Sequence, residues 1–409
     1  MPAAASWHRR SACIAGISLA IVATALLAAC DAATKHFDCP RFAEFRYRVD
    51  DDGGGRAPGL SSPMAPLMSA MSAAMATASA RTGKHSDAPP PHTVLVLSGG
   101  GPWGAFGAGF LAGWSGARIH PRPIFDLVTG VSTGALQATD AFLGPERDAQ
   151  VAGSYAIDAE TDLITRRGTL GGVFTGAFAD TAPLERRLRV ALAPLYDRVA
   201  AAGQDGRLLL VGAVDALDGE MYAIDLTAIA RILRGRVREE CYVGALMASA
   251  AVPVEFDRVE VGGRPYFDGG VRRSVFVADI QRAASAMPAG PESALYILVN
   301  GDRAAEPVAR LAEGLLPTLA RLRTLAVNQI EVTSIADVAH SSPAGFTTFI
   351  ASAAGQRCGA SDEGHDVIFA PRFLACLEAE GRRRWDGGDP WTRAAAGMTS
   401  NPAAPMSRK

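Results

Sequence analysis

The sequence has no marked excess of either charge and, beyond its N-terminus, no long apolar run. Its 40 Lys and Arg residues oppose 42 Asp and Glu residues, which gives a formal net charge of -2. A nucleic-acid-binding protein usually carries a basic excess, so this balance argues against nucleic acid as a partner. No apolar run after the N-terminus reaches the roughly 20 residues that a membrane-spanning helix needs, which excludes a polytopic membrane protein. The hydrophobic share of 48% is too high for a mainly disordered chain.

Cysteine and histidine are also scarce. Six cysteines and seven histidines are spread over 409 residues, with no CxxC pair and no Cys/His spacing typical of a metal site. The sequence therefore implies neither a metal nor another cofactor. Cys358 and Cys376 are close in sequence and could form a disulfide bond in an oxidising compartment, or could remain two free buried thiols.

The N-terminus is typical of an export signal, which we assign to residues 1–29. A short basic stretch precedes an apolar run over about residues 13–27, and small residues follow. The segment Leu27–Cys30 resembles a bacterial lipobox, in which Cys30 would receive lipid and become the first mature residue. We therefore predict an exported protein, lipid-anchored to a bacterial cell membrane at its periplasmic face or in the outer membrane. The alternatives are an ordinary signal peptide with a chance cysteine, or an uncleaved anchor.

Composition divides the rest of the chain into three parts. Residues 30–92 contain an Asp/Gly run, an Ala/Ser/Met-rich tract and three consecutive prolines, and this composition predicts a flexible tether because it cannot bury a core. One folded domain is predicted over residues 93–350. Residues 351–409 are predicted to be a C-terminal extension, whose tail from about Gly381 is rich in Arg, Gly, Pro and Ala and frays.

The folded domain begins with alternating strands and helices. Residues 93–97 are short, continuous and β-branched, as in a buried parallel strand, and a glycine loop and a helix over 105–114 follow. A second strand over 125–129 leads through another Gly-rich turn into a helix that reaches Leu143. This βαβα order predicts an α/β fold with a mainly parallel sheet and helices on its faces. Further strands are predicted at 208–213, 221–224, 254–261, 264–267, 294–300 and 346–351, and further helices at 238–251 and about 308–336.

The pattern G-x-S-x-G at Gly130–Gly134 lies between the second predicted strand and the helix after it. A serine on such a tight turn needs small neighbours, because bulky ones would collide in the bend, and Gly130 and Gly134 meet this need. The helix directs its free N–H groups and the positive end of its dipole at Ser132, which favours a developing negative charge there. Ser132 is therefore the candidate nucleophile, and a serine that merely caps a helix is the alternative.

A glycine loop at Gly99–Gly104 lies one strand–helix unit earlier. The amides near Gly100 and Gly101, together with the Thr133 amide, could hold the oxygen of a reacting carbonyl as an oxyanion hole, whereas Pro102 has no N–H to donate. The loop also matches G-x-G-x-x-G, the fingerprint of dinucleotide-binding proteins. That alternative needs an acidic residue at the end of the second strand, and the G-x-S-x-G turn stands there instead.

A nucleophilic serine needs a base, and the histidines are poorly placed for that role. Only His340 and His365 follow Ser132 at distances that suit the triad of a Ser–His–Asp hydrolase, and neither lies in a motif.

Asp268 is the other candidate base. It ends a predicted short hairpin and is followed by Gly269 and Gly270, which let the backbone turn sharply and bring a carboxylate close to another loop. A carboxylate can accept the serine proton if burial raises its pKa. By itself, Asp-Gly-Gly is also an ordinary turn.

The glycine loop, the G-x-S-x-G turn and the Asp-Gly-Gly turn, in this order, resemble the patatin-like phospholipase family. The resemblance covers residues 93–280, and more loosely residues to about 350, and the segment Ala248–Pro253 is similar to the family's helix-to-loop segment. It implies a three-layer α/β fold with a mainly parallel central sheet. It also implies a serine acyl hydrolase that cleaves phospholipid-like acyl esters through an acyl-enzyme intermediate, without a metal or cofactor.

The resemblance also implies roles for particular residues. Ser132 matches the nucleophile of a Ser–Asp dyad, and Asp268 matches the proton acceptor. The oxyanion loop is matched by Gly99, Gly100, Gly101 and Gly104, which act with the amide of Thr133. One position departs from the family, since Trp103 stands where Arg or Lys is often found, and the missing positive charge would weaken binding of an anionic head group or alter the rigidity of the loop. A Ser–His–Asp esterase and a catalytically silent lipid-binding lipoprotein are the functional alternatives.

Overall fold

The computed structural model describes residues 34–49, 92–118, 121–276, 293–302, 305, 308, 310, 313–340, 346–359 and 367–394. The predicted export signal, the lipidation site Cys30, most of the predicted tether and the candidate base His365 lie outside the described residues. None of the described helices is long and apolar enough to cross a membrane.

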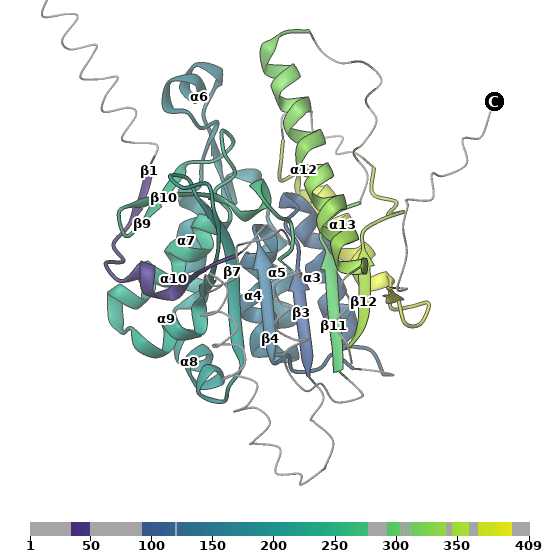
Figure 1. Ribbon diagram of the computed structural model, residues 1–409. Coiled ribbons are helices and arrows are strands. Elements are labelled where there is room, and N and C mark those ends of the chain that lie inside the picture. Colours follow the sequence, from purple (N-terminus) through teal and green to yellow (C-terminus); the bar gives the residue numbers. More distant parts are fainter. Residues whose placement is uncertain are drawn as a thin grey trace, which may run out of the picture.

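Parallel strands form the centre of a mixed sheet (Figure 1). In space they follow the order β7-β4-β3-β11-β12, with neighbouring strands parallel throughout. Their bounds are β3 (Thr93–Leu97), β4 (Leu127–Val131), β7 (Leu208–Asp215), β11 (Ser293–Val299) and β12 (Phe346–Ser352). The first four are almost continuously apolar and buried, as is typical of strands covered on both faces. The predicted α/β fold with a mainly parallel central sheet is confirmed.

Antiparallel strands extend this centre at both ends. β8 and β10 each pair with β7, β9 forms a hairpin with β10, and β13 pairs with β12. Their bounds are β8 (Met221–Asp225), β9 (Arg258–Val261), β10 (Arg264–Asp268) and β13 (Thr392–Arg393). The predicted strand over 254–261 is therefore only four residues long, because the chain first pairs as a loop with the segment around Ala179.

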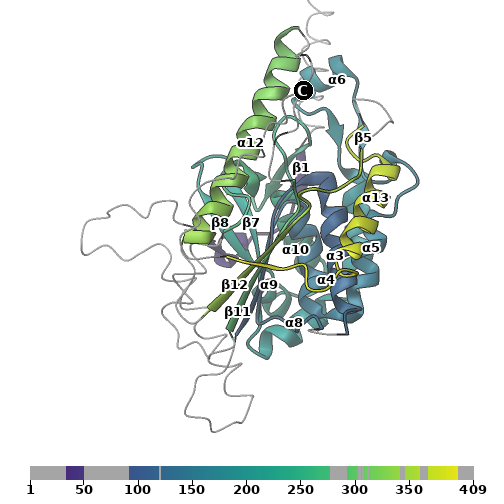
Figure 2. The ribbon, with the colours of Figure 1, turned by 90° about the vertical axis from the view of Figure 1, so that its right-hand side faces the viewer.

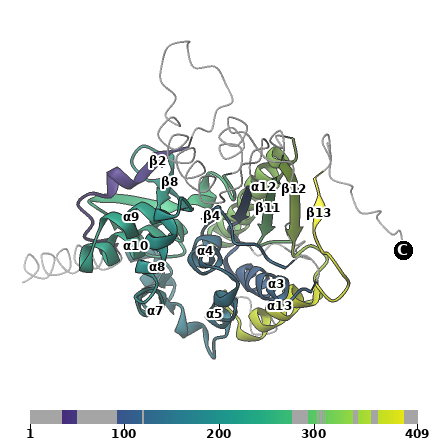
Figure 3. The ribbon, with the colours of Figure 1, turned by 90° about the horizontal axis from the view of Figure 1, so that it is seen from below.

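Helices cover both faces of the sheet, so the molecule has three layers. Figures 2 and 3 show α12 on one face and the remaining large helices on the other. The helices are α3 (Gly104–Ser115), α4 (Thr133–Leu143), α5 (Asp148–Tyr155), α7 (Ala182–Leu192), α8 (Tyr196–Gln204), α9 (Leu226–Ile232), α10 (Gly235–Ser249), α12 (Leu315–His340) and α13 (Pro371–Arg383). A short helix, α6 (Thr169–Thr175), rises from the body of the molecule (Figure 1).

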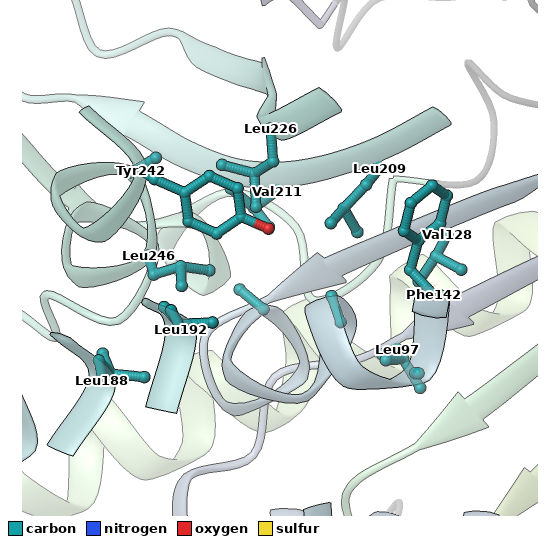
Figure 4. Close-up of a cluster of buried hydrophobic side chains, with 14 of the residues drawn as sticks. Leu97, Val128, Phe142, Leu188, Leu192, Leu209, Val211, Leu226, Tyr242 and Leu246 are labelled. Carbon is teal, nitrogen blue, oxygen red and sulfur yellow. The ribbon is translucent and has the colours of Figure 1, made fainter. Parts of the chain in front are cut away.

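The core has two parts because successive residues of a strand point to opposite faces. On β3, Leu95 and Leu97 join the cluster under α3 and α4, whereas Val94 and Val96 join a second cluster that includes Ile335 of α12. Figure 4 shows side chains of the first cluster. This double burial holds the carboxyl ends of the parallel strands in fixed positions, and the loops after them carry the candidate site.

The N-terminal segment corrects one prediction. Residues 34–49 belong to the fold and not to a tether, since β1 (Thr34–Phe37) pairs with β9 and β2 (Arg46–Arg48) pairs with β8. A disulfide bond joins Cys39 to Cys241 of α10. Three phenylalanines in this segment are buried, namely Phe37, Phe42 and Phe45. The low-complexity composition of the residues after it concealed this short aromatic segment.

The C-terminal segment corrects a second prediction. The proposed boundary at residue 350 falls inside β12, and the chain beyond it packs against the domain. A disulfide bond joins Cys358 to Cys376 of α13. The frayed tail predicted from Gly381 is wrong for residues 381–394, because Trp385 and Trp391 both lie against the rings of Phe110 and Trp114.

Candidate active site

The strand register brings the G-x-S-x-G turn and the Asp-Gly-Gly turn together. β4 pairs with β7 as far as Gly212, and β10 pairs with β7 from Ala213 onward. β8 pairs with the other edge of β7, along residues on both sides of the Gly212–Ala213 junction. β4 and β10 therefore lie end to end along the same edge of β7. Ser132 directly follows the end of β4, and Asp268 is the last residue of β10, paired with Ala213. The two side chains therefore meet where the two strands end.

The turn that carries Ser132 requires glycine on both sides. Ser132 has φ 55° and ψ -125°, a backbone conformation that residues with a side chain rarely adopt. A Cβ atom at position 130 would lie 2.5 Å from the carbonyl oxygen of Gly134, and one at position 134 would lie 2.4 Å from that of Leu97. The motif is thus needed for the fold of the turn, which is the steric feature expected of a nucleophile on a strand-to-helix bend.

A buried serine holds this turn in place. The Ser132 N–H donates to Ser249 Oγ at 3.0 Å, and that hydroxyl donates to the carbonyl oxygen of Gly212 at 2.6 Å. Ser249 is the last residue of α10 and is fully buried. It lies in the Ala248–Pro253 segment noted for its resemblance to the family, but no residue-level signal singled it out.

Asp268 is buried, with only 4% of its surface exposed. Its N–H donates to the Ala251 carbonyl at 2.9 Å, and its Oδ1 accepts from the Gly270 N–H at 2.7 Å. Oδ2 is buried and has no hydrogen-bond partner among the described residues. Burial raises the pKa of Asp268 to about 6, although the nearby Ser132 hydroxyl and the Gly270 N–H both favour the ionised carboxylate.

The glycine loop adopts a conformation that needs glycine. Gly100 and Gly101 have φ values of 147° and 54°. A Cβ atom at position 100 would lie 1.7 Å from the carbonyl oxygen of Asn300. Asn300 is fully buried at the end of β11, where its N–H donates to Ser98 Oγ and its Nδ2 donates to the Ser98 carbonyl, both at 2.8 Å. Asn300 thus supports the loop from a distant part of the chain, and the sequence offered no signal for it.

The amides of the loop differ in whether they are free to bind a ligand. The Gly99 N–H donates to the Ser274 carbonyl at 3.2 Å, and the Gly104 N–H donates to the carbonyls of Gly101 and Pro102 in the 3-10 turn before it. Their amides are therefore engaged, which corrects their assignment as oxyanion donors. Among the described residues, the N–H groups of Gly100, Gly101 and Thr133 have no protein acceptor.

A buried polar network lies directly beneath Thr133. Its Oγ1 forms a short hydrogen bond with the hydroxyl of Tyr155. Gln137 Nε2 donates to that hydroxyl at 2.9 Å and to the Gly104 carbonyl at 2.6 Å. Burial raises the pKa of Tyr155, so its hydroxyl stays neutral. The network links the first turn of α4 to the start of α3, and Tyr155 belongs to this support.

Trp103 anchors the glycine loop through its ring. The ring lies edge-to-face against Phe373 of α13, with 5.5 Å between the ring centroids. At the position where the family often has a cation, this chain therefore has an aromatic ring that contacts helix α13.

Two of the histidines have neighbours other than Ser132. His92 precedes β3, at the amino end of the parallel strands, and lies 3.9 Å from Asp126 Oδ2. His36 lies on β1, two strands away from β10, beside Glu260. His340 is the last residue of α12. Asp268 is thus the described candidate base that adjoins the serine.

The comparisons with known proteins agree with this architecture. A family model described as patatin-like phospholipase matches residues 95–280. The comparison with curated proteins finds no match. The matched segment contains the glycine loop, Ser132 and Asp268, and the family comprises lipid acyl hydrolases. The chain therefore contains a patatin-like phospholipase domain over residues 95–280, and through this domain it is a carboxylic ester hydrolase that acts on lipids.

Proposed function

We propose that this lipid acyl hydrolase works through a Ser132–Asp268 dyad, without a histidine, and forms an acyl-enzyme on Ser132. The observation that carries the proposal is the buried carboxyl of Asp268 beside the Ser132 hydroxyl, with its Oδ2 bound to no other group among the described residues. An unpartnered buried carboxylate oxygen is costly, and proton transfer from the serine would satisfy it.

In the first step, Ser132 Oγ attacks the carbonyl carbon of the lipid ester while Asp268 Oδ2 accepts the hydroxyl proton. A carbon–oxygen bond forms, and the carbonyl π electrons move to the carbonyl oxygen. A carboxylate is a weaker base than imidazole, so its raised pKa of about 6 brings it closer to the pH of reaction and makes it a more effective proton acceptor.

The developing oxyanion is held by backbone amides. The N–H groups of Gly100 and Gly101 approach from the glycine loop, and that of Thr133 comes from the first turn of α4, whose dipole adds positive potential. These donors are fixed before the reaction by Asn300 and by the hydroxyl of Tyr155. Fixed donors stabilise the transition state without the cost of reorganisation.

The intermediate then collapses in two stages. The bond to the alcohol breaks, the alcohol takes the proton from Asp268, and the acyl group remains esterified to Ser132. Water next attacks this ester while Asp268 accepts its proton, and the fatty acid leaves as the proton returns to Ser132.

A labelling experiment tests the nucleophile. A fluorophosphonate should modify Ser132 in the folded protein, and Ser132→Ala should lose both labelling and hydrolysis of a short-chain nitrophenyl ester. Ser274→Ala is the matched control, because Ser274 is another buried serine next to the loop and only its backbone carbonyl is used. Labelling that persists in Ser132→Ala, or that maps to Ser274, would refute the assignment.

We also propose that the protein is exported and lipid-anchored at Cys30. The two disulfide bonds support an oxidising compartment, since such bonds are rare in the cytosol. Acyl chains on Cys30 would keep the enzyme near its substrate. Incorporation of labelled palmitate into the protein, and its loss in Cys30→Ser, is the expected result; equal incorporation in the variant would exclude this site.

A further inference from the structure

Large apolar side chains are exposed around the edge of the molecule where Ser132 and Asp268 lie. Leu315, Leu319 and Leu322 of α12 are 72%, 48% and 60% exposed. Val254 is 57% exposed, and Val271, in the short turn directly after Asp268, is 40% exposed. We call these five residues the apolar rim. Exposed apolar side chains that gather in one place usually mark an interaction surface.

Contacts link the elements that carry the rim to one another and to the turn after Asp268. The loop that carries Val254 is fixed from one side by the Phe178 N–H, which donates to the Val254 carbonyl at 3.0 Å. From the other side, Arg323 of α12 forms an ion pair with Glu255 at 2.8 Å. α12 also contacts the turn of Val271. These contacts place α12 beside the loop of Val254 and beside the turn that directly follows Asp268.

The two halves of α12 have different surroundings. Ile335 and Ser334, in the second half, are buried against the sheet. The first half extends beyond the carboxyl ends of the strands, opposite α6 (Figures 1 and 2). Its leucines at 315, 319 and 322 follow the i, i+4, i+7 spacing of one helix face. This half of the helix has an apolar face that the described fold does not cover.

We propose that the apolar rim inserts into the surface of a phospholipid bilayer and sets the catalytic opening against it. The inference deepens the proposed function, on which it rests, because a lipid ester must leave the bilayer to reach Ser132. A second copy of the chain would bury the same leucines, but it would also close the route by which lipid enters. The substrate class therefore selects the membrane as the occupant.

The first test measures local insertion. Leu319→Trp and Ile124→Trp are compared in the full chain carrying Ser132→Ala, which prevents hydrolysis of the vesicles. Ile124 is the matched control because it is 51% exposed but lies at the amino ends of the parallel strands. With vesicles of brominated phosphatidylcholine and phosphatidylglycerol, quenching beyond the native background should occur for Trp at 319 and not at 124. Equal quenching, or none at 319, would overturn the proposal.

The second test measures delivery of substrate. In Leu319→Ser/Leu322→Ser, the ratio of vesicle hydrolysis to hydrolysis of a soluble nitrophenyl ester should fall about tenfold, since apolar contact with the bilayer is lost. Ile124→Ser/Ile232→Ser should leave that ratio unchanged. An unchanged ratio in the first variant would overturn the inference. So would a dimer, seen by sedimentation, that the same variant dissociates. If the parent protein itself did not hydrolyse the soluble ester, that result would instead count against the dyad.

Discussion

At the scale of single residues, the burial of Asp268 determines how the proposed reaction depends on pH. Only the ionised carboxylate can accept the Ser132 proton, and burial raises the pKa of Asp268 to about 6. We predict that kcat/KM for a soluble ester falls about tenfold per pH unit below that value and is level above it. A profile measured from pH 4 to pH 8 checks this, and a level profile through pH 5 would contradict it.

The same raised pKa predicts a cost in stability. Below the unfolded-state pKa of about 3.8, Asp268 is neutral in both the folded and the unfolded protein. Between that pH and about 6, Asp268 loses its proton in the unfolded protein but keeps it in the folded one. Stability therefore falls as the pH rises through this window, by up to about 3 kcal/mol. Asp268→Asn should be more stable than the parent protein at pH 8 and equally stable at pH 3.5. Urea unfolding at both pH values measures the difference, and a less stable variant at pH 8 would contradict the account.

Sequence motifs identified the residues of the proposed dyad but not the residues that support them. Ser132 and Asp268 were predicted because short glycine-rich patterns surround them. Ser249 and Asn300 carried no such signal, since each is one polar residue in an apolar element and its partner lies far away in the chain. The assignment of Gly99 as an oxyanion donor was wrong because the carbonyl that engages its amide belongs to Ser274, which no local pattern could reveal.

At the scale of elements, α13 supports the glycine loop through the contact between Phe373 and Trp103. Phe373→Ala should lower kcat on a soluble ester roughly tenfold with little change in KM, because a small displacement of oxyanion donors is costly. Trp385→Ala is the matched control. Trp385 packs the end of α13 on Phe110, at 5.2 Å between rings, and does not touch the loop. Its loss should lower stability but leave the kcat of the folded enzyme unchanged.

Substitutions at Trp103 itself separate the ring contact from charge. Trp103→Phe should retain most of the activity, whereas Trp103→Arg, which restores the charge often found in the family, should be as impaired as Phe373→Ala. Improved hydrolysis of an anionic phospholipid by Trp103→Arg would show instead that charge at this position governs the reaction.

The central elements could be predicted from sequence, and the peripheral ones could not. β3 was predicted to the residue, and β7 and β11 to within two residues, because strands covered on both faces are apolar throughout. β8 and β12 were also predicted to within two residues. β1 and β2 are short edge strands that exist only through pairing with β9 and β8, so local pattern gave no signal for them. The predicted helix over 308–336 begins at Leu315 and ends at His340 instead.

At the scale of the whole molecule, two disulfide bonds fasten the segments that lie outside the matched domain. Cys39–Cys241 spans 202 residues and holds the N-terminal segment, whereas Cys358–Cys376 spans 18 and holds α13. Loop-closure entropy predicts losses of about 5 and about 3 kcal/mol when the first and second bonds are removed by paired Cys→Ser substitutions. Denaturant unfolding measures both losses, and an equal or reversed order would contradict this account.

The features on which both proposals rest lie on one side of the molecule. The dyad, the glycine loop and the apolar rim all lie at the carboxyl ends of the parallel strands, where ligands bind in open α/β sheets. The family match ends at residue 280, yet α12 and α13, which follow it, supply the rim and the support of the loop. The sequence motifs alone could not predict this, because both helices act through their packing on the domain.

The central claim is that a carboxylate, not an imidazole, activates the serine. The most direct measurement is kcat/KM of purified Asp268→Asn on a soluble nitrophenyl ester, beside His340→Ala and His365→Ala. We predict a loss of at least about a thousandfold for Asp268→Asn in a folded protein, and a change of less than about threefold for each histidine variant. Near-normal activity in Asp268→Asn, or a large loss in either histidine variant, would contradict the account.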